Sequence, residues 1–249
     1  MERSASGHTP EELEQVLNSE DWKNAVALSS SKLRSQLFFD QKQLYDRNLL
    51  TLKFRDFVFE VPEAATEGRD FDLFLQKIIW QGTYQPEVDF DKLKIPFRAI
   101  STDLVSGKSI SLKKGNLSKA LRASATIPLR YTPIRVDSMI LVDGGILANM
   151  PTKFAEEFNP DIIISVNTTS PLLKSNNLNS VVNIADQVIS IAMEELSNDN
   201  LKRSNLVITP KLEGYLNDDF SNSDTLIQIG LFGIPFKLYR NSRNYNKKD

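Results

Sequence analysis

The chain has 249 residues, with 30 Lys plus Arg against 32 Asp plus Glu, no cysteine and a single histidine, His8. These counts exclude disulfides, a thiolate nucleophile, Cys-ligated zinc and iron–sulfur clusters, and one imidazole cannot build a His-rich metal site. The balanced charge gives no electrostatic reason to expect nucleic acid as a partner. Hydrophobic residues at 41% and charged residues at 25% are typical of a globular protein.

The first elements are predicted from local signals. A helix begins after Thr9, because Thr9, Pro10 and Glu12 form a capping box with a proline in the first turn. Strand-like stretches between residues 29 and 69 indicate a hairpin or a loop-rich region. Residues 70–80 then predict a short helix with an apolar face.

The middle of the chain alternates strands and helices. Residues 96–102 and 109–112 predict the two strands of a hairpin, and residues 116–128 predict a helix that ends near a proline. Residues 139–145 predict a buried parallel strand that runs into a glycine turn. Residues 161–167 predict a second parallel strand, buried on both faces, so that the segment forms a βαβ unit.

The C-terminal part predicts an amphipathic helix over residues 178–198, a strand over 206–210 and a last helix near 221–230. Residues 236–249 carry several Lys and Arg side chains among Asn. We interpret this segment as a solvated basic tail, with a contact to anionic lipid or phosphate as the alternative.

Asp143 is the most informative carboxylate, because it ends a predicted buried strand and precedes Gly144 and Gly145. Open α/β sheets place catalytic and ligand-binding groups at this position, and the two glycines let the backbone turn tightly. An Asp-Gly pair is also common in turns without a function. The spacing alone therefore leaves both interpretations open. Asp103 is expected at a hairpin turn, and Asp218 and Asp219 in a loop.

Several motifs that follow one another in a fixed order resemble the patatin-like phospholipase family. They are a Thr-Asp-Leu hairpin with Gly107, an Arg-Ala-Ser helix that ends at Pro128, the Asp-Gly-Gly turn and an Asn-x-Pro helix start. TPEELEQVLNSEDW near the N-terminus and LVITPKLEGYLNDDFSNSDTLIQIG near the C-terminus match as well. The resemblance covers residues 5–235. It implies a partial patatin-like domain over residues 1–235, followed by the basic polar tail over 236–249.

The resemblance also implies a fold and a chemistry. The fold is α/β, with helices on both sides of a mixed sheet in three layers. The chemistry is that of a serine acyl hydrolase with a Ser-Asp dyad, which acts on phospholipids or other acyl lipids without a metal or an organic cofactor. Asp143 matches the dyad aspartate, and Gly144 and Gly145 match the rest of its motif. Arg122 and Ser124 are candidates for lining the pocket, with an ordinary helix-surface position as the alternative.

The nucleophile of such a dyad does not occur in the 249 residues. The family places a Gly-rich oxyanion loop and a Gly-x-Ser-x-Gly elbow before the helix that begins after Thr9 here. Ser4 and Ser6 lack the flanking glycines of an elbow, and Ser124 lies between two alanines in a predicted helix. We therefore expect a truncated domain that lacks its N-terminal strands, keeps the dyad aspartate and is inactive as it stands.

Two other interpretations stay open, namely a non-catalytic lipid-binding or regulatory module and a decayed gene fragment. The sequence has no run of about 18 apolar residues and no apolar signal-peptide region at its start. Taken as given, it predicts a cytoplasmic protein that contacts membranes peripherally at most. A location at the cell envelope stays open for a longer form of the protein.

Overall fold

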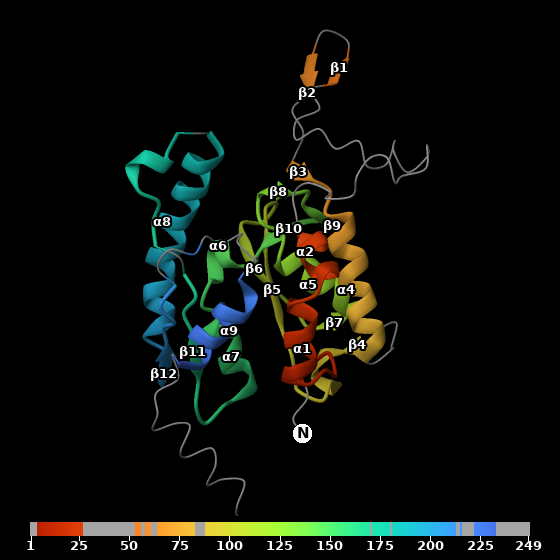
Figure 1. Ribbon diagram of the computed structural model, residues 1–249, viewed down its shortest axis with the longest axis vertical. Helices are drawn as coiled ribbons and strands as arrows, with labels where there is room; N and C mark the ends of the chain where they lie inside the picture. Colours follow the sequence, from red (N-terminus) through yellow and green to blue (C-terminus); the bar gives the residue numbers. More distant parts are fainter. Residues whose placement is uncertain are drawn as a thin grey trace, which may run out of the picture. The chain divides into compact units, whose positions relative to one another are not determined.

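The computed structural model describes residues 4–26, 53–55, 58–60, 64–82, 88–169, 171–179, 181–212, 215 and 222–232. The chain divides into two compact units, Met1–Leu147 and Ala148–Asp249 (Figure 1). Helices occur together with antiparallel and parallel strand pairs, so the predicted α/β class is confirmed. Asp218, Asp219 and the predicted tail over 236–249 lie outside the described residues.

The first unit contains the helices α1 (Pro10–Leu17), α2 (Glu20–Val26), α4 (Arg69–Gly82) and α5 (Leu117–Ser124). Three of them, α1, α4 and α5, begin within one residue of the predicted start, and α2 is a further helix that was not predicted from the sequence. The capping box of α1 is confirmed, because the Glu12 N–H donates to Thr9 Oγ1 and the Thr9 N–H donates to the Glu12 carboxylate. The Asn116 side chain caps α5 by accepting the Lys119 N–H.

The strands described in the first unit are short. They are β1 (Lys53–Arg55), β2 (Val58–Glu60), β3 (Ala64–Thr66), β4 (Val88–Asp89), β5 (Ala99–Asp103), β6 (Lys108–Leu112), β7 (Lys114–Gly115), β8 (Leu129–Tyr131), β9 (Ile134–Val136) and β10 (Met139–Asp143). The main sheet has the order β6-β5-β10-β9. Its β5–β6 hairpin is the predicted one, and β1 and β2 form a second hairpin.

The prediction that Asp143 ends a parallel strand is wrong, because β10 runs antiparallel to both β5 and β9. Only Asp137 and Ser138 separate β9 from β10, and Asp137 has a φ of 52°. Such a tight turn forces two strands into a hairpin. The continuous apolar run of β10 suggested a parallel strand, but here it reflects burial within an antiparallel sheet.

Helix α5 packs on β5 and β10 and closes the core of the first unit (Figure 1). Phe90, Ala99, Leu117 and Ala120 form this core, with Phe90 contributed by the 3-10 turn Phe90–Lys92. On the other side of the helical layer, α4 contacts both α2 and α5. The end of β10, with Asp143, therefore lies at the edge of a packed helix-on-sheet core.

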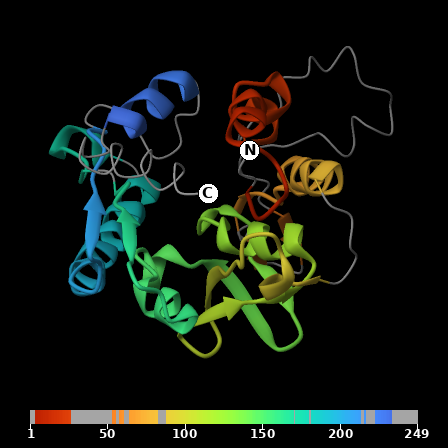
Figure 2. The ribbon, with the colours of Figure 1, turned by 90° about the horizontal axis from the view of Figure 1, so that it is seen from below.

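The second unit combines helices with one parallel pair of strands. Its elements are α7 (Thr152–Ala155), the 3-10 turns Glu156–Phe158 and Ser175–Asn177, β11 (Ile164–Val166), α8 (Val181–Leu201), β12 (Leu206–Ile208) and α9 (Ser223–Phe232), while α6 (Gly145–Ala148) begins in the first unit. β11 and β12 lie side by side as a parallel pair (Figure 2). The βαβ unit is therefore β11–α8–β12, and the predicted unit that joins β10 to β11 is wrong.

β11 is parallel, as predicted, but it is not buried on both faces. Ile164 is 54% and Val166 is 51% exposed, and Ile184 and Val188 on α8 are also exposed. The prediction of burial on both faces is wrong for β11, because no element among the described residues covers these side chains. None of the described helices combines the length and apolar character that a membrane span requires.

Candidate active site

Asp143 occupies the point where the chain leaves the main sheet and enters α6. Its backbone N–H donates to the carbonyl oxygen of Thr126 at 2.8 Å, and its carboxylate Oδ1 accepts the Gly145 N–H at 2.7 Å. The side chain is partly buried. Burial raises the pKa of Asp143, and the Gly145 N–H acts in the opposite direction. A carboxylate with a raised pKa is a better proton acceptor near neutral pH than an ordinary one.

Gly144 lets this turn pass directly over the neighbouring strand. A Cβ atom added at Gly144 would overlap the backbone carbonyl of Ile100 on β5. Any side chain at this position would therefore push the turn away from the sheet. The position needs glycine for close approach of two backbone segments, and this approach fixes where Asp143 stands.

Asp103 lies on the same sheet in an opposite electrostatic environment. Its two carboxylate oxygens accept the N–H groups of Val105, Ser106 and Ile140 at 3.0–3.1 Å and the Ser106 hydroxyl at 2.6 Å. The Ser106 hydroxyl, followed by the Ile140 N–H, lowers the pKa of Asp103 to about 2. Asp103 is therefore charged at neutral pH and ties the hairpin turn to β10, as its predicted place in a turn indicates.

Arg122 is 2% exposed and is held by contacts within the chain. Its guanidinium donates to Thr126 Oγ1 at 2.6 Å and to the Glu67 carbonyl at 3.1 Å, and its Nε lies 2.9 Å from Asp72 Oδ1. It also lies over the Tyr131 ring, 4.6 Å from its centre. Arg122 therefore joins α4, α5 and β8, and Thr126 connects it to the Asp143 turn.

Ser124 is the last residue of α5 and is partly exposed. It has no strand directly before it, so the sharp strand-to-helix turn of a nucleophile elbow is not formed at this position. The structure thus places Ser124 and Arg122 on the helix that covers the sheet with Asp143. A role of either residue in lining a pocket stays a prediction.

The N-terminal serines contact the single histidine. Ser4 Oγ and Ser6 Oγ lie 2.8 Å apart, and Ser6 Oγ lies 3.2 Å from His8 Nδ1. This chain of hydrogen bonds was not foreseen from the sequence, although the close spacing of the three residues permits it. Within the described residues no carboxylate contacts His8, so the third member of a Ser-His-Asp triad is not present there.

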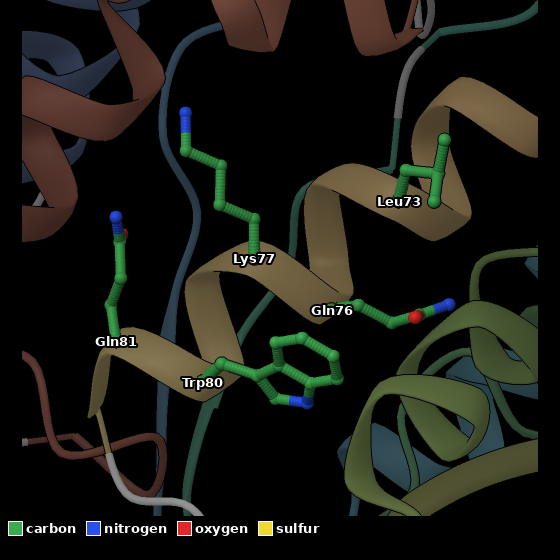
Figure 3. Close-up of a pocket in the computed structure, with 5 residues that line it drawn as sticks. All are labelled: Leu73, Gln76, Lys77, Trp80 and Gln81. Carbon is green, nitrogen blue, oxygen red and sulfur yellow. The ribbon is translucent and has the colours of Figure 1, made fainter.

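Two further features of the described part of the chain concern ligands. A shallow hollow of about 440 Å³ lies against α4, and Figure 3 shows that all of its lining side chains project from that one helix. They are Leu73, Gln76, Lys77, Trp80 and Gln81. None of the site residues predicted from the sequence lines it.

No cluster of three or more His, Asp or Glu side chains in the described residues could hold a metal ion.

Comparison with known proteins decides the family. The family described as patatin-like phospholipase matches residues 4–156, which is more than half of the chain and includes the Asp143 turn. The chain belongs to the patatin-like phospholipase family. The predicted membership is therefore confirmed.

Curated relatives match shorter segments. Over 79 residues the chain is 42% identical to uncharacterised NTE family proteins of Mycobacterium bovis and Mycobacterium tuberculosis, which is 32% of this chain and 22% of each relative. Another NTE family protein of Mycobacterium bovis is 40% identical over 55 residues, or 22% of this chain and 9% of the relative. The chain thus matches less than a quarter of the length of these relatives.

Proposed function

We propose that this chain supplies the aspartate half of a Ser-Asp dyad in a lipid acyl hydrolase, with Asp143 as the general base. One observation carries the proposal. The partly buried Asp143 carboxylate accepts one hydrogen bond, from Gly145, and has a raised pKa. The Asp103 carboxylate on the same sheet accepts four hydrogen bonds and has a pKa of about 2. When the environments of two carboxylates push their pKa values apart in this way, the group with the higher pKa is suited to act as a base and the other to act as a structural anion.

In the proposed reaction the substrate is a phospholipid or another acyl lipid. The Asp143 carboxylate takes the proton from a serine hydroxyl as that oxygen attacks the ester carbonyl carbon. Collapse of the tetrahedral intermediate breaks the ester bond, and the proton on Asp143 passes to the leaving alcohol. Water then attacks the acyl-serine, and Asp143 accepts its proton. When the second tetrahedral intermediate collapses, the bond to the serine oxygen breaks, the proton passes from Asp143 to that oxygen, and the fatty acid is released.

The serine in this reaction comes from a segment outside the 249 residues. The sequence holds no Gly-x-Ser-x-Gly motif, and Ser4, Ser6 and Ser124 lack its glycines. Among the described residues β11 pairs with β12 alone, so its other edge is open to pairing with an additional strand, which supports the same proposal. The 249-residue chain by itself is therefore expected to be inactive.

The test compares two forms of the protein. The first is the 249-residue chain, and the second is the product of the reading frame extended upstream of the Met1 codon. We expect an in-frame Gly-rich loop and Gly-x-Ser-x-Gly motif in the extension. The extended protein should hydrolyse 4-nitrophenyl butyrate and phosphatidylcholine vesicles, and the shorter chain should not. A serine-reactive fluorophosphonate should label the extended protein alone.

Three outcomes would contradict the proposal. Hydrolysis by the 249-residue chain would mean that the nucleophile is among its own residues. An upstream sequence without the motif would remove the source of the serine. Binding of phosphatidylcholine vesicles by the shorter chain, without turnover by either form, would instead support the non-catalytic lipid-binding module.

A further inference from the structure

Ser101, in the middle of β5, carries a buried hydroxyl group. The residue is 0% exposed, and its Oγ has no hydrogen-bond partner among the described residues. A buried hydroxyl without a partner is unusual, because the lost hydration is not compensated. Such a hydroxyl is a candidate donor to a polar group that lies on the same face of the sheet.

The sheet register brings Ser101 to Asp143. The two residues stand directly opposite each other in the antiparallel β5–β10 ladder. Opposite residues in such a ladder project from the same face, with Cβ atoms about 4.5–5.5 Å apart. The turn after Asp143 gives a second, independent indication, since a Cβ atom at Gly144 would lie 3.1 Å from the Ser101 nitrogen.

The two groups are complementary in hydrogen-bonding capacity. An ionised carboxylate offers about four acceptor sites, and Asp143 uses one of them, on Oδ1, for the Gly145 N–H. The Ser101 hydroxyl can donate one hydrogen bond. The other titratable group of β5, Asp103, already accepts four hydrogen bonds from the turn and β10 and does not compete for this donor.

Thr102 provides the internal comparison. Its hydroxyl is also buried and without a partner, but side chains alternate along a strand, so Thr102 projects from the opposite face with Val142 as its ladder partner. A buried hydroxyl is therefore present on each face of β5, and only that of Ser101 shares a face with the candidate base.

We propose that Ser101 is a positioning residue for Asp143. Rotation about the Cα–Cβ bond of Ser101 lets its hydroxyl donate to the second oxygen, Oδ2, when Asp143 is ionised. The carboxylate is then held from two sides, by Gly145 at Oδ1 and by Ser101 at Oδ2, and its orientation toward the serine nucleophile is fixed. The catalytic meaning of this contact rests on the proposed function, whereas the contact itself can be tested without it.

The test is a ¹³C NMR titration of the Asp carboxyl groups in the full 249-residue chain, with the Asp143 signal assigned from Asp143→Asn. Ser101→Ala removes a donor to the charged form, so the pKa of Asp143 should rise by about one unit. Ser101→Thr keeps the hydroxyl and should restore the wild-type pKa. Thr102→Val removes a buried hydroxyl from the other face and should leave the pKa of Asp143 unchanged.

The proposal is overturned if Ser101→Ala leaves the pKa of Asp143 unchanged, or if Thr102→Val raises it equally. Ser101→Cys, with its weaker thiol donor, provides the same comparison in a nearly isosteric side chain if the alanine variant does not fold. A shift with Ser101→Ala in a protein whose extended form shows no hydrolysis would leave the contact standing and reject the proposed function. Hydrolysis by the extended protein, with no change in the pKa of Asp143 in Ser101→Ala, would support the proposed function and reject the contact.

Discussion

The backbone N–H of Asp143 donates to the carbonyl oxygen of Thr126 at 2.8 Å, so the candidate base is fixed to the segment that follows α5. The Thr126 hydroxyl in turn accepts from Arg122 at 2.6 Å and donates to the Arg122 carbonyl at 2.7 Å. Thr126 therefore connects a buried guanidinium to the Asp143 turn. Disturbing Thr126 or Arg122 should act on the site through the fold rather than through contact with a substrate.

Thr126→Val should lower the free energy of unfolding by about 1–3 kcal/mol, because it leaves an Arg122 N–H buried without an acceptor. Urea denaturation measures the change. Thr132→Val is the matched control, since its hydroxyl bonds to the Thr66 carbonyl at a longer 3.5 Å and does not touch Arg122. Equal decreases in the free energy of unfolding in the two variants would show that the Arg122–Thr126 hydrogen bond does not contribute more to stability than the Thr132–Thr66 one.

Arg122→Met should destabilise the protein by about 1–3 kcal/mol, because the hydrogen bonds of the buried guanidinium are lost while Asp72, whose side chain is 37% exposed, keeps contact with water. Burial outweighs the effect of Arg122 and raises the pKa of Asp72, so this carboxylate is already unfavourably placed when charged. The double variant Arg122→Met with Asp72→Asn should therefore recover part of the loss. A double-mutant cycle in urea measures this recovery, and strictly additive losses would contradict an energetic coupling between the two groups.

Gly144→Ala should destabilise the protein by about 1–3 kcal/mol, since the added Cβ overlaps the Ile100 carbonyl and the turn must move. Gly230→Ala is the control, because nothing lies within 4 Å of a Cβ at that helical position. Alanine is favoured over glycine in a helix, so this second variant should be neutral or stabilising. Thermal unfolding of the two variants compares them directly. A neutral Gly144→Ala variant would show that the turn does not depend on the close approach.

Asp143→Asn should stabilise the protein increasingly as pH rises. The folded-state pKa of Asp143 lies above its ordinary value of 3.8, so the unfolded chain loses its proton first and stability falls as pH rises through the window between the two values. Asparagine does not titrate and removes this loss. Calorimetric melting temperatures from about pH 2 to pH 7 measure the difference between the variant and the wild type.

Asp103→Asn should show the opposite dependence. The folded-state pKa of Asp103 is about 2, below its ordinary value of 3.8. The stability that the charged carboxylate contributes is therefore present above the ordinary value and is lost as pH falls toward the folded-state value. The variant should melt at a lower temperature than the wild type near neutral pH, and this difference should shrink in acid. If the melting temperatures of the Asp143→Asn and Asp103→Asn variants, relative to the wild type, changed with pH in the same direction, the opposite pKa shifts of the two carboxylates would be rejected.

Local signals in the sequence predicted the local structure well. The capping box of Thr9 and Glu12 formed because both partners lie within one helical turn. The β5–β6 hairpin formed around the short turn that Asp103 and Ser106 stabilise. Both features depend only on residues that are close in the chain.

Features that depend on distant residues were not predictable in the same way. The antiparallel direction of β10 is set by β5, about 40 residues earlier in the chain, and by the tight turn from β9. The pairing of Ser101 with Asp143 follows from that register, which one sequence does not specify. Likewise, the burial of Arg122 depends on Asp72 and Glu67 from another part of the chain.

The central claim is that Asp143 is the general base of a lipid acyl hydrolase, and kcat for 4-nitrophenyl butyrate in the extended protein tests it most directly. Asp143→Asn should lower kcat by about 10²–10⁴-fold, the usual contribution of a general base. Asp103→Asn, measured below its melting temperature, should keep kcat within a small factor of the wild type. A wild-type kcat for Asp143→Asn in a folded, serine-containing protein would contradict the account.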